Sequence, residues 1–270
     1  ERAEREAFLA SEPGAAPFMR PFVGAEEYIN GGDRSILFLR DAGPELIRSL
    51  PAVAARVAAV RKLRLDSPSA GTRALADFPT RFHITVVPEG SFLCIPEVSS
   101  ERREYIPIGW LDYPIIPSNK LRIILNAKEY HFSILTSKIH NSWSRYIGGK
   151  LKSDFQYSVG VNYNPFPWPL LDDESQDRLK SVALGVLESR SRHSSATLAD
   201  LYDPDLMPPD LRKAHRDLDI AVDRLYRKEP FADDRERVEH LFRLYEQMTA
   251  GLLARADKPK RGRTRKAGTG

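Results

Sequence analysis

The stretch His131–Pro169, HFSILTSKIHNSWSRYIGGKLKSDFQYSVGVNYNPFPWP, contains the patterns that decide the fold of this chain. Its first part predicts a helix that ends at Gly148-Gly149, with apolar positions Ile134, Ile139 and Trp143. Its second part predicts one extended segment, because two sets of residues alternate with a period of two. The packed set is Leu151, Ser153, Phe155 and Tyr157, and the polar set is Lys152, Asp154, Gln156 and Ser158. Three prolines, Pro165, Pro167 and Pro169, then end regular structure.

This stretch alone is compatible with two interpretations. A helix with basic residues beside a strand that presents Lys, Asp and Gln could read the edges of nucleic-acid bases. A solvated strand face next to an ordinary surface helix gives the same pattern and is more common. The choice between them depends on the rest of the chain.

Length and composition predict one or two ordinary globular domains, since the chain has 270 residues and 41% of them are hydrophobic. Cys94 is the only cysteine and has apolar neighbours, so we expect a reduced, buried thiol. No apolar run approaches the roughly 20 residues that a membrane-spanning helix needs. The chain starts at Glu1 without a secretory leader, so we expect a fragment of a cytoplasmic protein.

The formal net charge of +4 is unevenly distributed. It is +3 over residues 1–171, −4 over residues 172–255 and +5 over residues 256–270. The last segment, which contains KPKRGRTRKAGTG, is polar and rich in glycine, so we expect a disordered basic tail. Any surface that binds DNA should therefore lie on the mildly basic first part.

Hydrophobic periodicity predicts an α+β fold. A helix is expected over residues 44–64, divided at Pro51, because proline suits only the first turn of a helix. Short β segments divided by Pro, Gly and Ser predict a mixed or antiparallel sheet, with strands near residues 35–39, 82–88, 91–96, 105–111 and 121–127. Three amphipathic helices, near residues 172–190, 210–225 and 234–253, predict a small all-α bundle at the end of the chain.

Four segments of the chain resemble the C-terminal third of MmeI-like enzymes. They are YIPIGWL (105–111), FSILTSKIHNSWSRYIGGKLKSDFQYS (132–158), YNPFPWP (163–169) and LADLYDPDLMPPDLRKAHRDLDIAVDRLY (198–226). These enzymes are type IIL restriction–modification proteins, in which one chain joins a nuclease, an adenine-N6 DNA methyltransferase and a target-recognition domain. The resemblance implies a target-recognition domain at residues 1–170 and a C-terminal helical domain at residues 171–255, followed by the tail at residues 256–270.

Catalytic motifs are absent from the sequence. Asn164-Pro165-Phe166-Pro167 approaches the methyltransferase motif that accepts a flipped adenine, but Phe166 stands where that motif has proline. No acid precedes a lysine by two residues, as metal-dependent nucleases of the PD-(D/E)xK kind require, and the six histidines lack zinc-site spacing. We therefore expect no catalytic residue, no metal and no cofactor in this chain. The resemblance places S-adenosylmethionine and a divalent metal in N-terminal domains outside it.

The resemblance also assigns candidate DNA contacts. Family members read base pairs at alternate positions of the GKLKSDFQYS segment and at one position of the earlier PSNKL stretch, which correspond here to Lys152, Asp154, Gln156 and Lys120. Independently, Lys donates to guanine O6 and N7 and Asp accepts from cytosine N4, so Lys152 and Asp154 match one G·C pair. On a strand, their spacing would put both side chains on one face, about 7 Å apart.

Five basic residues are candidates for contact with the DNA backbone: Lys138, Arg145, Lys150, Arg102 and Arg103. For Arg102 and Arg103, a salt-bridged loop is an equally good interpretation. The sequence thus predicts a module that binds a specific double-stranded DNA sequence and works with the methyltransferase and nuclease domains of a parent chain. A freestanding specificity subunit and a protein-interaction module without DNA binding are the alternatives.

Overall fold

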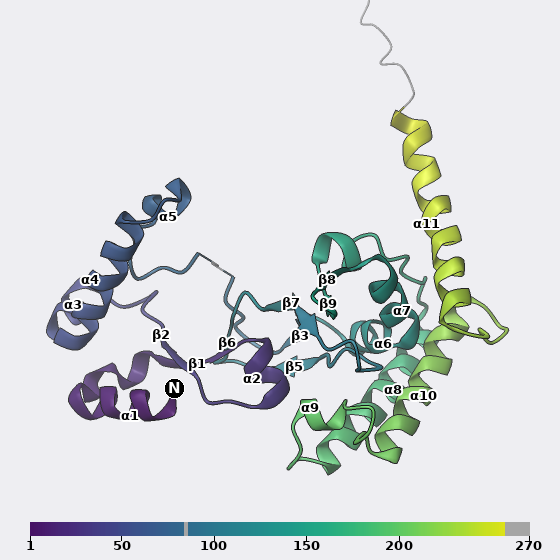
Figure 1. Cartoon of the computed structure of the whole chain (residues 1–270), viewed down its shortest axis with the longest axis horizontal. Coiled ribbons are helices and arrows are strands. Elements are labelled where there is room, and N and C mark those ends of the chain that lie inside the picture. The colour runs from purple at the N-terminus through teal and green to yellow at the C-terminus, as the bar shows by residue number, and fades with distance from the viewer. Residues whose placement is uncertain (84–85, 257–270) are drawn as a thin grey trace, which may run out of the picture.

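The chain folds into a small N-terminal lobe and a larger body, as the computed structural model shows (Figure 1). The structure describes residues 1–83 and 86–256, with side chains up to residue 250. Of the tail expected at residues 256–270, residues 257–270 lie outside this range. The N-terminal lobe contains α1 (Arg2–Ser11), η1 (Pro13–Phe18), β1 (Met19–Val23), β2 (Ser35–Leu37), α3 (Pro44–Ser49), α4 (Pro51–Leu65) and α5 (Ala70–Ala74). The strand β1 also leads into the body, because it pairs with β2 on one side and with β6 of the body on the other.

The body contains the remaining elements. Its first half has α2 (Ala25–Asn30), β3 (Phe92–Pro96), β4 (Val98–Ser99), β5 (Gly109–Leu111), β6 (Ile116–Pro117) and β7 (Leu121–Leu125). Its second half has α6 (Glu129–Thr136), α7 (Lys138–Ile147), β8 (Gly149–Leu151), β9 (Asp154–Gln156), η2 (Val159–Tyr163), α8 (Asp173–Arg192), α9 (Leu198–Leu201), α10 (Pro209–Tyr226) and α11 (Asp234–Ala256).

The helix expected over residues 44–64 is divided at Pro51, as predicted. Pro51 begins α4, and the residue before it, Leu50, offers no side-chain acceptor to the free amides of the first turn. Glu12 from the end of α1 supplies the acceptor instead. Its two carboxylate oxygens accept hydrogen bonds from the backbone N–H groups of Ala52 (3.0 Å) and Val53 (2.7 Å). The start of α4 is thus tied to the first helix of the chain.

The strands form three small sheets of three strands each, in the orders β2-β1-β6, β5-β3-β7 and β4-β9-β8. All pairs are antiparallel except β1 with β6, so the prediction of a mixed sheet arrangement is confirmed. The central strand β3 is buried on both faces, with Phe92 and Cys94 toward α2 and Leu93 and Ile95 toward the main core. Burial raises the pKa of the Cys94 thiol to about 12, as expected for a core cysteine.

Part of the expected sheet is not formed. Of the strand expected over residues 82–88, residues 84–85 lie outside the described range, and the described residues on either side are not in a strand. The helix expected over residues 131–148 is divided into α6 and α7 at Ser137, which adopts an extended conformation with ψ of 159°. Neither feature follows from periodicity alone, because the apolar pattern continues through both.

The predicted α+β fold with a helical C-terminal part is confirmed, and the C-terminal helices pack on the first part of the chain as well as on each other. Helix α10 packs on α8, α8 packs on α6, and α11 packs along α7. One hydrophobic cluster therefore runs from β3 through α6 and α7 into α8 and α10, and includes Trp143 and Phe166. The proline-rich junction is part of this core, since the Tyr226 hydroxyl donates a hydrogen bond of 2.9 Å to the Pro167 carbonyl. The sheet region and the C-terminal helices are thus held in one body.

Candidate nucleic-acid interface

Helix α7 leads directly into a β hairpin, and Gly148 makes this sharp connection possible. A Cβ atom at Gly148 would collide with the Ser144 carbonyl oxygen and lie 2.8 Å from Asn162 Nδ2. Only glycine therefore fits between the end of α7 and the start of β8. The hairpin is thereby held against a largely buried helix of the body.

The expectation of one extended segment over residues 150–158 is wrong, because β8 and β9 form an antiparallel hairpin. In its register Leu151 pairs with Asp154, which leaves Lys152 and Ser153 as the turn. Lys152 has a φ of 59°, in the left-handed region. The sequence pattern suggested that Lys152 and Asp154 share one strand face. In the structure they do not, because Lys152 lies in the turn and Asp154 on β9. Leu151, placed on the packed face by that pattern, is 54% exposed at the tip.

The two polar residues that do share one strand face are Asp154 and Gln156, which alternate on β9. This strand is central in its sheet, with Val98 of β4 opposite Gln156 on one side and Gly149 of β8 opposite it on the other. The two polar side chains project from one face. Phe155 projects from the other, where the Arg145 guanidinium lies 5.0 Å from its ring centroid.

Glu97 brings Lys120 to this sheet, although the two segments are distant in sequence. The backbone N–H of Glu97 donates to the Lys120 carbonyl (2.9 Å), and the Glu97 carbonyl accepts from the N–H of Tyr157 (2.7 Å). The Glu97 carboxylate, 11% exposed, also lies 3.3 Å from Lys120 Nζ and 3.2 Å from Arg122 Nη2. Lys120 therefore lies beside the end of β9, in an ion pair. Glu97 is not predictable from the sequence pattern, in which its only signal is a carboxylate at the end of a wholly apolar strand.

The loop after β4 borders the hairpin. The backbone N–H of Glu101 donates to Asp154 Oδ1 at 3.3 Å. Arg145 of α7 fixes the loop, since its guanidinium donates to the carbonyls of Arg103 and Glu104, the latter at 2.8 Å. Burial lowers the pKa of the Arg103 guanidinium, while the nearby charges of Asp154 and Asp203 raise it. The loop thus adds an arginine next to the acidic residue of the hairpin.

The five basic residues predicted to contact the DNA backbone differ in their surroundings. Lys138 forms an ion pair of 2.6 Å with Glu104, and Arg102 forms one of 2.6 Å with Asp205. Arg145 and Arg103 are partly buried in the contacts described above. Lys150 is exposed on β8, and in the described part of the chain neither it nor Lys152 has an ion-pair partner. These two lysines flank the exposed Leu151 at the tip of the hairpin.

Within residues 1–83 and 86–256, no group of three or more His, Cys, Asp or Glu side chains could hold a metal ion. In the same ranges, no helix combines the length and apolar character needed to cross a membrane.

Family models cover almost the whole chain. The model described as the MmeI target recognition domain matches residues 1–170, and the one described as the MmeI C-terminal domain matches residues 171–253. The chain belongs to the MmeI family. In MmeI-family terms, the β8–β9 hairpin and Lys120 lie in the target-recognition part, and α8, α10 and α11 lie in the C-terminal part.

Two relatives are similar over most of this chain. DNA methyltransferase A of Bacillus subtilis (strain 168) is 38% identical over 237 residues, which cover 88% of this chain and 27% of that protein. A solved structure of the type IIL restriction–modification enzyme MmeI in complex with DNA has a TM-score of 0.90 at 38% identity, and the match covers 92% of this chain and 33% of that one. The chain spans about a quarter to a third of the length of these MmeI-family relatives.

Proposed function

We propose that this chain selects a specific double-stranded DNA sequence as the recognition part of a longer MmeI-type restriction–modification enzyme. Support comes from the membership of its two parts in the MmeI target-recognition and C-terminal families. The solved relative that it resembles at a TM-score of 0.90 is an MmeI enzyme in complex with DNA. Methyl transfer and cleavage would belong to the other domains of the parent, which would bind S-adenosylmethionine and a divalent metal.

The single observation that carries the proposal is the chemistry of the β8–β9 hairpin. Its tip presents Lys150 and Lys152 without ion-pair partners in the described residues. Its second strand, β9, presents Asp154 and Gln156 on one face. A two-stranded β ribbon fits into the major groove of B-DNA. Lysine donors next to carboxylate and amide acceptors match the exposed edges of base pairs. The hairpin would enter the groove tip first.

The individual roles proposed here come from the family resemblance and from hydrogen-bond complementarity with base edges. Lys152 would donate to guanine O6 and N7 and Asp154 would accept from cytosine N4, which together specify one G·C pair. Gln156 and Lys120 would read neighbouring pairs, and Lys150 would contact a phosphate. The side chains of Arg102, Lys138 and Arg145 already contact protein groups, so they would position the loop and the hairpin. Arg103 would contact the DNA backbone.

The experiment reverses the order of donor and acceptor. Lys152→Glu combined with Asp154→Arg in the parent enzyme should convert the preference at one position from G·C to C·G. Either substitution alone should reduce discrimination by about 1–3 kcal/mol, because one base edge is left mismatched. Sequencing of methylated sites in cells that express each variant gives the recognised motif directly.

A matched control is present on α10. Lys213 and Asp217 form an exposed ion pair of 2.6 Å, so Lys213→Glu with Asp217→Arg makes the same charge exchange away from the hairpin. Its methylated motif should be unchanged. If Lys152 only contacts phosphate, the hairpin double variant keeps its motif, and Lys152→Ala weakens binding to all sequences while the salt slope falls by about one. That outcome would refute base recognition by this pair.

A further inference from the structure

The N-terminal lobe has an incomplete hydrophobic core. Its cluster contains three buried residues, Ala15, Leu39 and Val53, whereas the main cluster of the body contains 24. Helix α4 has 15 residues but buries only Val53 and Arg64. A unit of this size normally needs a larger core, or another body packed against it, to be stable.

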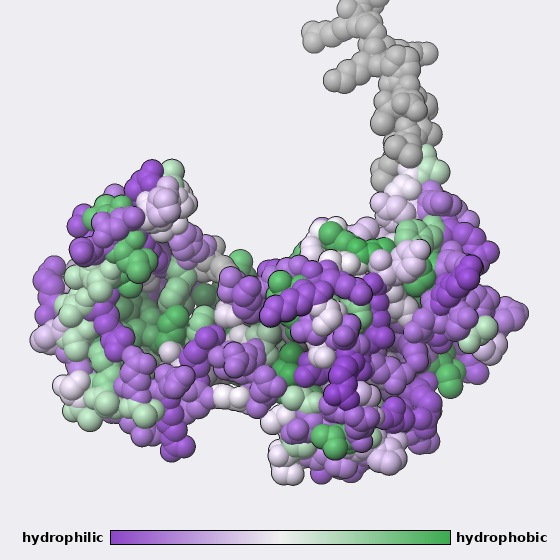
Figure 2. Space-filling model, in the orientation of Figure 1, coloured by the Kyte–Doolittle hydropathy of each residue, from purple (hydrophilic) through white to green (hydrophobic). Residues whose placement is uncertain are grey.

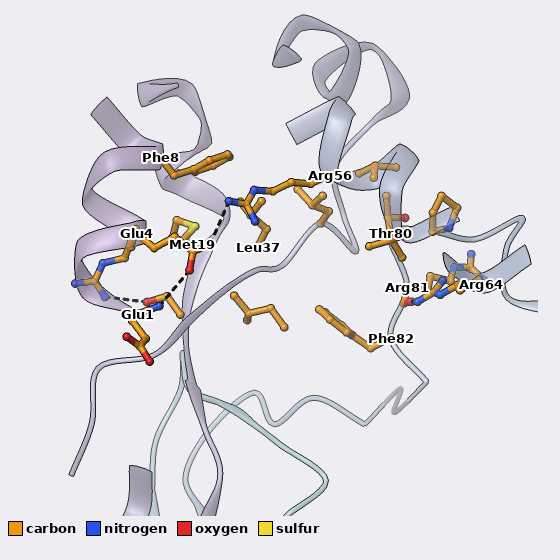
Figure 3. Close-up of a pocket in the computed structure, with 17 residues that line it drawn as sticks. Glu1, Glu4, Phe8, Met19, Leu37, Arg56, Arg64, Thr80, Arg81 and Phe82 are labelled. Atoms are coloured by element: carbon orange, nitrogen blue, oxygen red, sulfur yellow. Dashed lines mark hydrogen bonds and ion pairs between the residues drawn. The ribbon is translucent and has the colours of Figure 1, made fainter. Parts of the chain in front are cut away.

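An apolar slot opens on this lobe, between α1, β1, β2, α4 and residues 79–82 (Figure 3). Its volume is about 350 Å³, and its apolar walls include Phe8, Met19, Leu37, Val57, Val60 and Phe82. The space-filling view shows hydrophobic surface on the side of the lobe that faces a broad hollow between the lobe and the body (Figure 2). Such a surface is typical of a contact with another protein segment.

Three of the four arginines that line the slot are engaged by other groups of the protein, and Arg5 is one of them, paired with Asp33. Arg56 lies 3.4 Å from Glu4, and its guanidinium lies 4.7 Å from the centroid of the Phe8 ring. Arg64 donates to the carbonyls of Leu75 (2.9 Å) and Phe78 (2.7 Å). These arginines are therefore not arranged to bind phosphate, which makes DNA a poor occupant of the slot.

The apolar surface continues from the slot along the outer side of α4. Val60 lines the slot and is 38% exposed, and Leu63, one turn further along, is 71% exposed. Val60 and Leu63 therefore present apolar side chains to solvent on α4, beside the slot.

We propose that the slot and the outer face of α4 dock an apolar segment from the remaining part of the MmeI-type enzyme, and that this contact fixes the recognition part relative to that remainder. The inference rests on the proposed function, since it requires a longer parent chain. About two thirds or more of each relative lies outside the match to this chain, so a large additional body is present in them. Glu1 itself lines the slot, so a chain that continued before Glu1 would start at its edge. Covalent attachment gives an effective concentration in the millimolar range, so the docking segment needs little intrinsic affinity.

The test measures the accessibility of thiols introduced at this surface. Val60→Cys and Leu63→Cys are made in this chain and in the full-length parent, with Leu206→Cys as the control, because Leu206 is 64% exposed on the C-terminal part. The native Cys94 is fully buried and does not compete for the reagent. Alkylation rates at each introduced cysteine are followed by mass spectrometry of the peptide that contains it, without DNA.

The expected result is that both α4 thiols react at least about tenfold more slowly in the parent than in the isolated chain, because thiol reactivity requires access to the sulfur. The control should react at similar rates in both. Equal rates at residues 60 and 63 in both proteins would refute the proposal. So would protection that appears only with DNA, or protection in the isolated chain that rises with concentration as the chain dimerises. Since the measurement needs no DNA, a failure of docking is distinguishable from a failure of DNA recognition.

Discussion

The hydroxyl of Tyr105 donates a hydrogen bond of 2.7 Å to Asp219 Oδ2, which joins the loop beside the hairpin to helix α10 of the C-terminal part. The other oxygen, Oδ1, accepts from the backbone N–H of Lys138 at 2.7 Å. Ser137, which precedes α7, makes no side-chain cap, so Asp219 caps this helix from 81 residues away. One buried carboxylate therefore fixes the loop, the start of α7 and α10 relative to each other.

Removal of the Tyr105 hydroxyl should destabilise the chain. Tyr105→Phe leaves one oxygen of the buried Asp219 carboxylate without its donor, which we expect to cost about 1–3 kcal/mol of unfolding free energy. Urea unfolding measures this loss. Tyr146→Phe is the control, because Tyr146 is 70% exposed, and its unfolding midpoint should match wild type. Equal midpoints for the two variants would contradict the structural role of this bond.

Asp219 should also make stability depend on pH. Burial raises the pKa of its carboxyl group to about 7, although the hydrogen bonds from Tyr105 and Lys138 lower it. In the unfolded chain the pKa of an aspartate is about 3.9. Between these values the folded state holds a proton that the unfolded state has lost, so this contribution to the unfolding free energy falls as pH rises to about 7 and is constant above. Burial lowers the pKa values of His140 and His215, so the unfolded state binds more protons at these residues. Their contributions to the unfolding free energy therefore rise with pH.

Because these contributions oppose each other, the comparison is between wild type and Asp219→Asn, which leaves both histidines in place. The unfolding free energy of each is measured from pH 4 to pH 8. The wild-type value minus the variant value should decrease toward pH 7, by at most about 1.4 kcal/mol per pH unit. A difference that stays constant over this range would show that Asp219 does not titrate there.

Replacement of Lys152 by glycine should weaken DNA binding without lowering the stability of the fold. Lys152 has a φ of 59°, a conformation that costs a non-glycine residue roughly 1–2 kcal/mol. Lys152→Gly should therefore preserve or raise the melting temperature while it weakens DNA binding. Asn126→Gly is the matched control, since Asn126 has a φ of 54° away from the hairpin, and it should leave DNA affinity unchanged. Equal DNA affinity for both variants and wild type would count against contact between Lys152 and DNA.

Two arginines near the end of α8 should differ in their effect on stability. Arg190 Nη1 donates to the Ile108 carbonyl at 2.6 Å, and its Nε donates to the Tyr202 hydroxyl at 2.7 Å. Arg190→Ala should cost about 1–3 kcal/mol, because it leaves these partners unsatisfied. Arg192 forms an exposed pair with Asp210 at 3.1 Å, so Arg192→Ala should change stability by less than about 1 kcal/mol. Thermal unfolding of the two variants tests the order, and similar losses would contradict it.

The sequence predicted elements whose signals are local. Pro51 marked the division between two helices, and the helix expected near residues 172–190 is α8, whose first turn is capped by Asp172 through a hydrogen bond of 2.9 Å from the N–H of Ser175. The strands at residues 92–96 and 121–125 follow from short runs of β-branched and aromatic residues. Family resemblance, rather than periodicity, supplied the candidate residues for DNA recognition.

The features that the sequence did not predict depend on distant or unusual partners. The β8–β9 turn consists of Lys152 and Ser153, without the Gly or Asn that usually marks a hairpin. Helix α7 is separated from α6 at Ser137, and its first turn is capped by Asp219 of α10. Lys120 meets β9 only through backbone hydrogen bonds of Glu97. For α7 and Lys120 the stabilising group lies far along the chain, where a local pattern contains no information about it.

The exposed tip of the β8–β9 hairpin has a consequence for the evolution of new specificities. Leu151, Lys152 and Ser153 are all exposed, while the helix that carries the hairpin is anchored by the buried Trp143. Substitutions at exposed positions usually change stability by less than about 0.5 kcal/mol. If these residues read bases, a lineage can exchange one recognised sequence for another through single mutations, without compensating changes in the protein interior. Divergence of recognition would then not be limited by the folding of the chain.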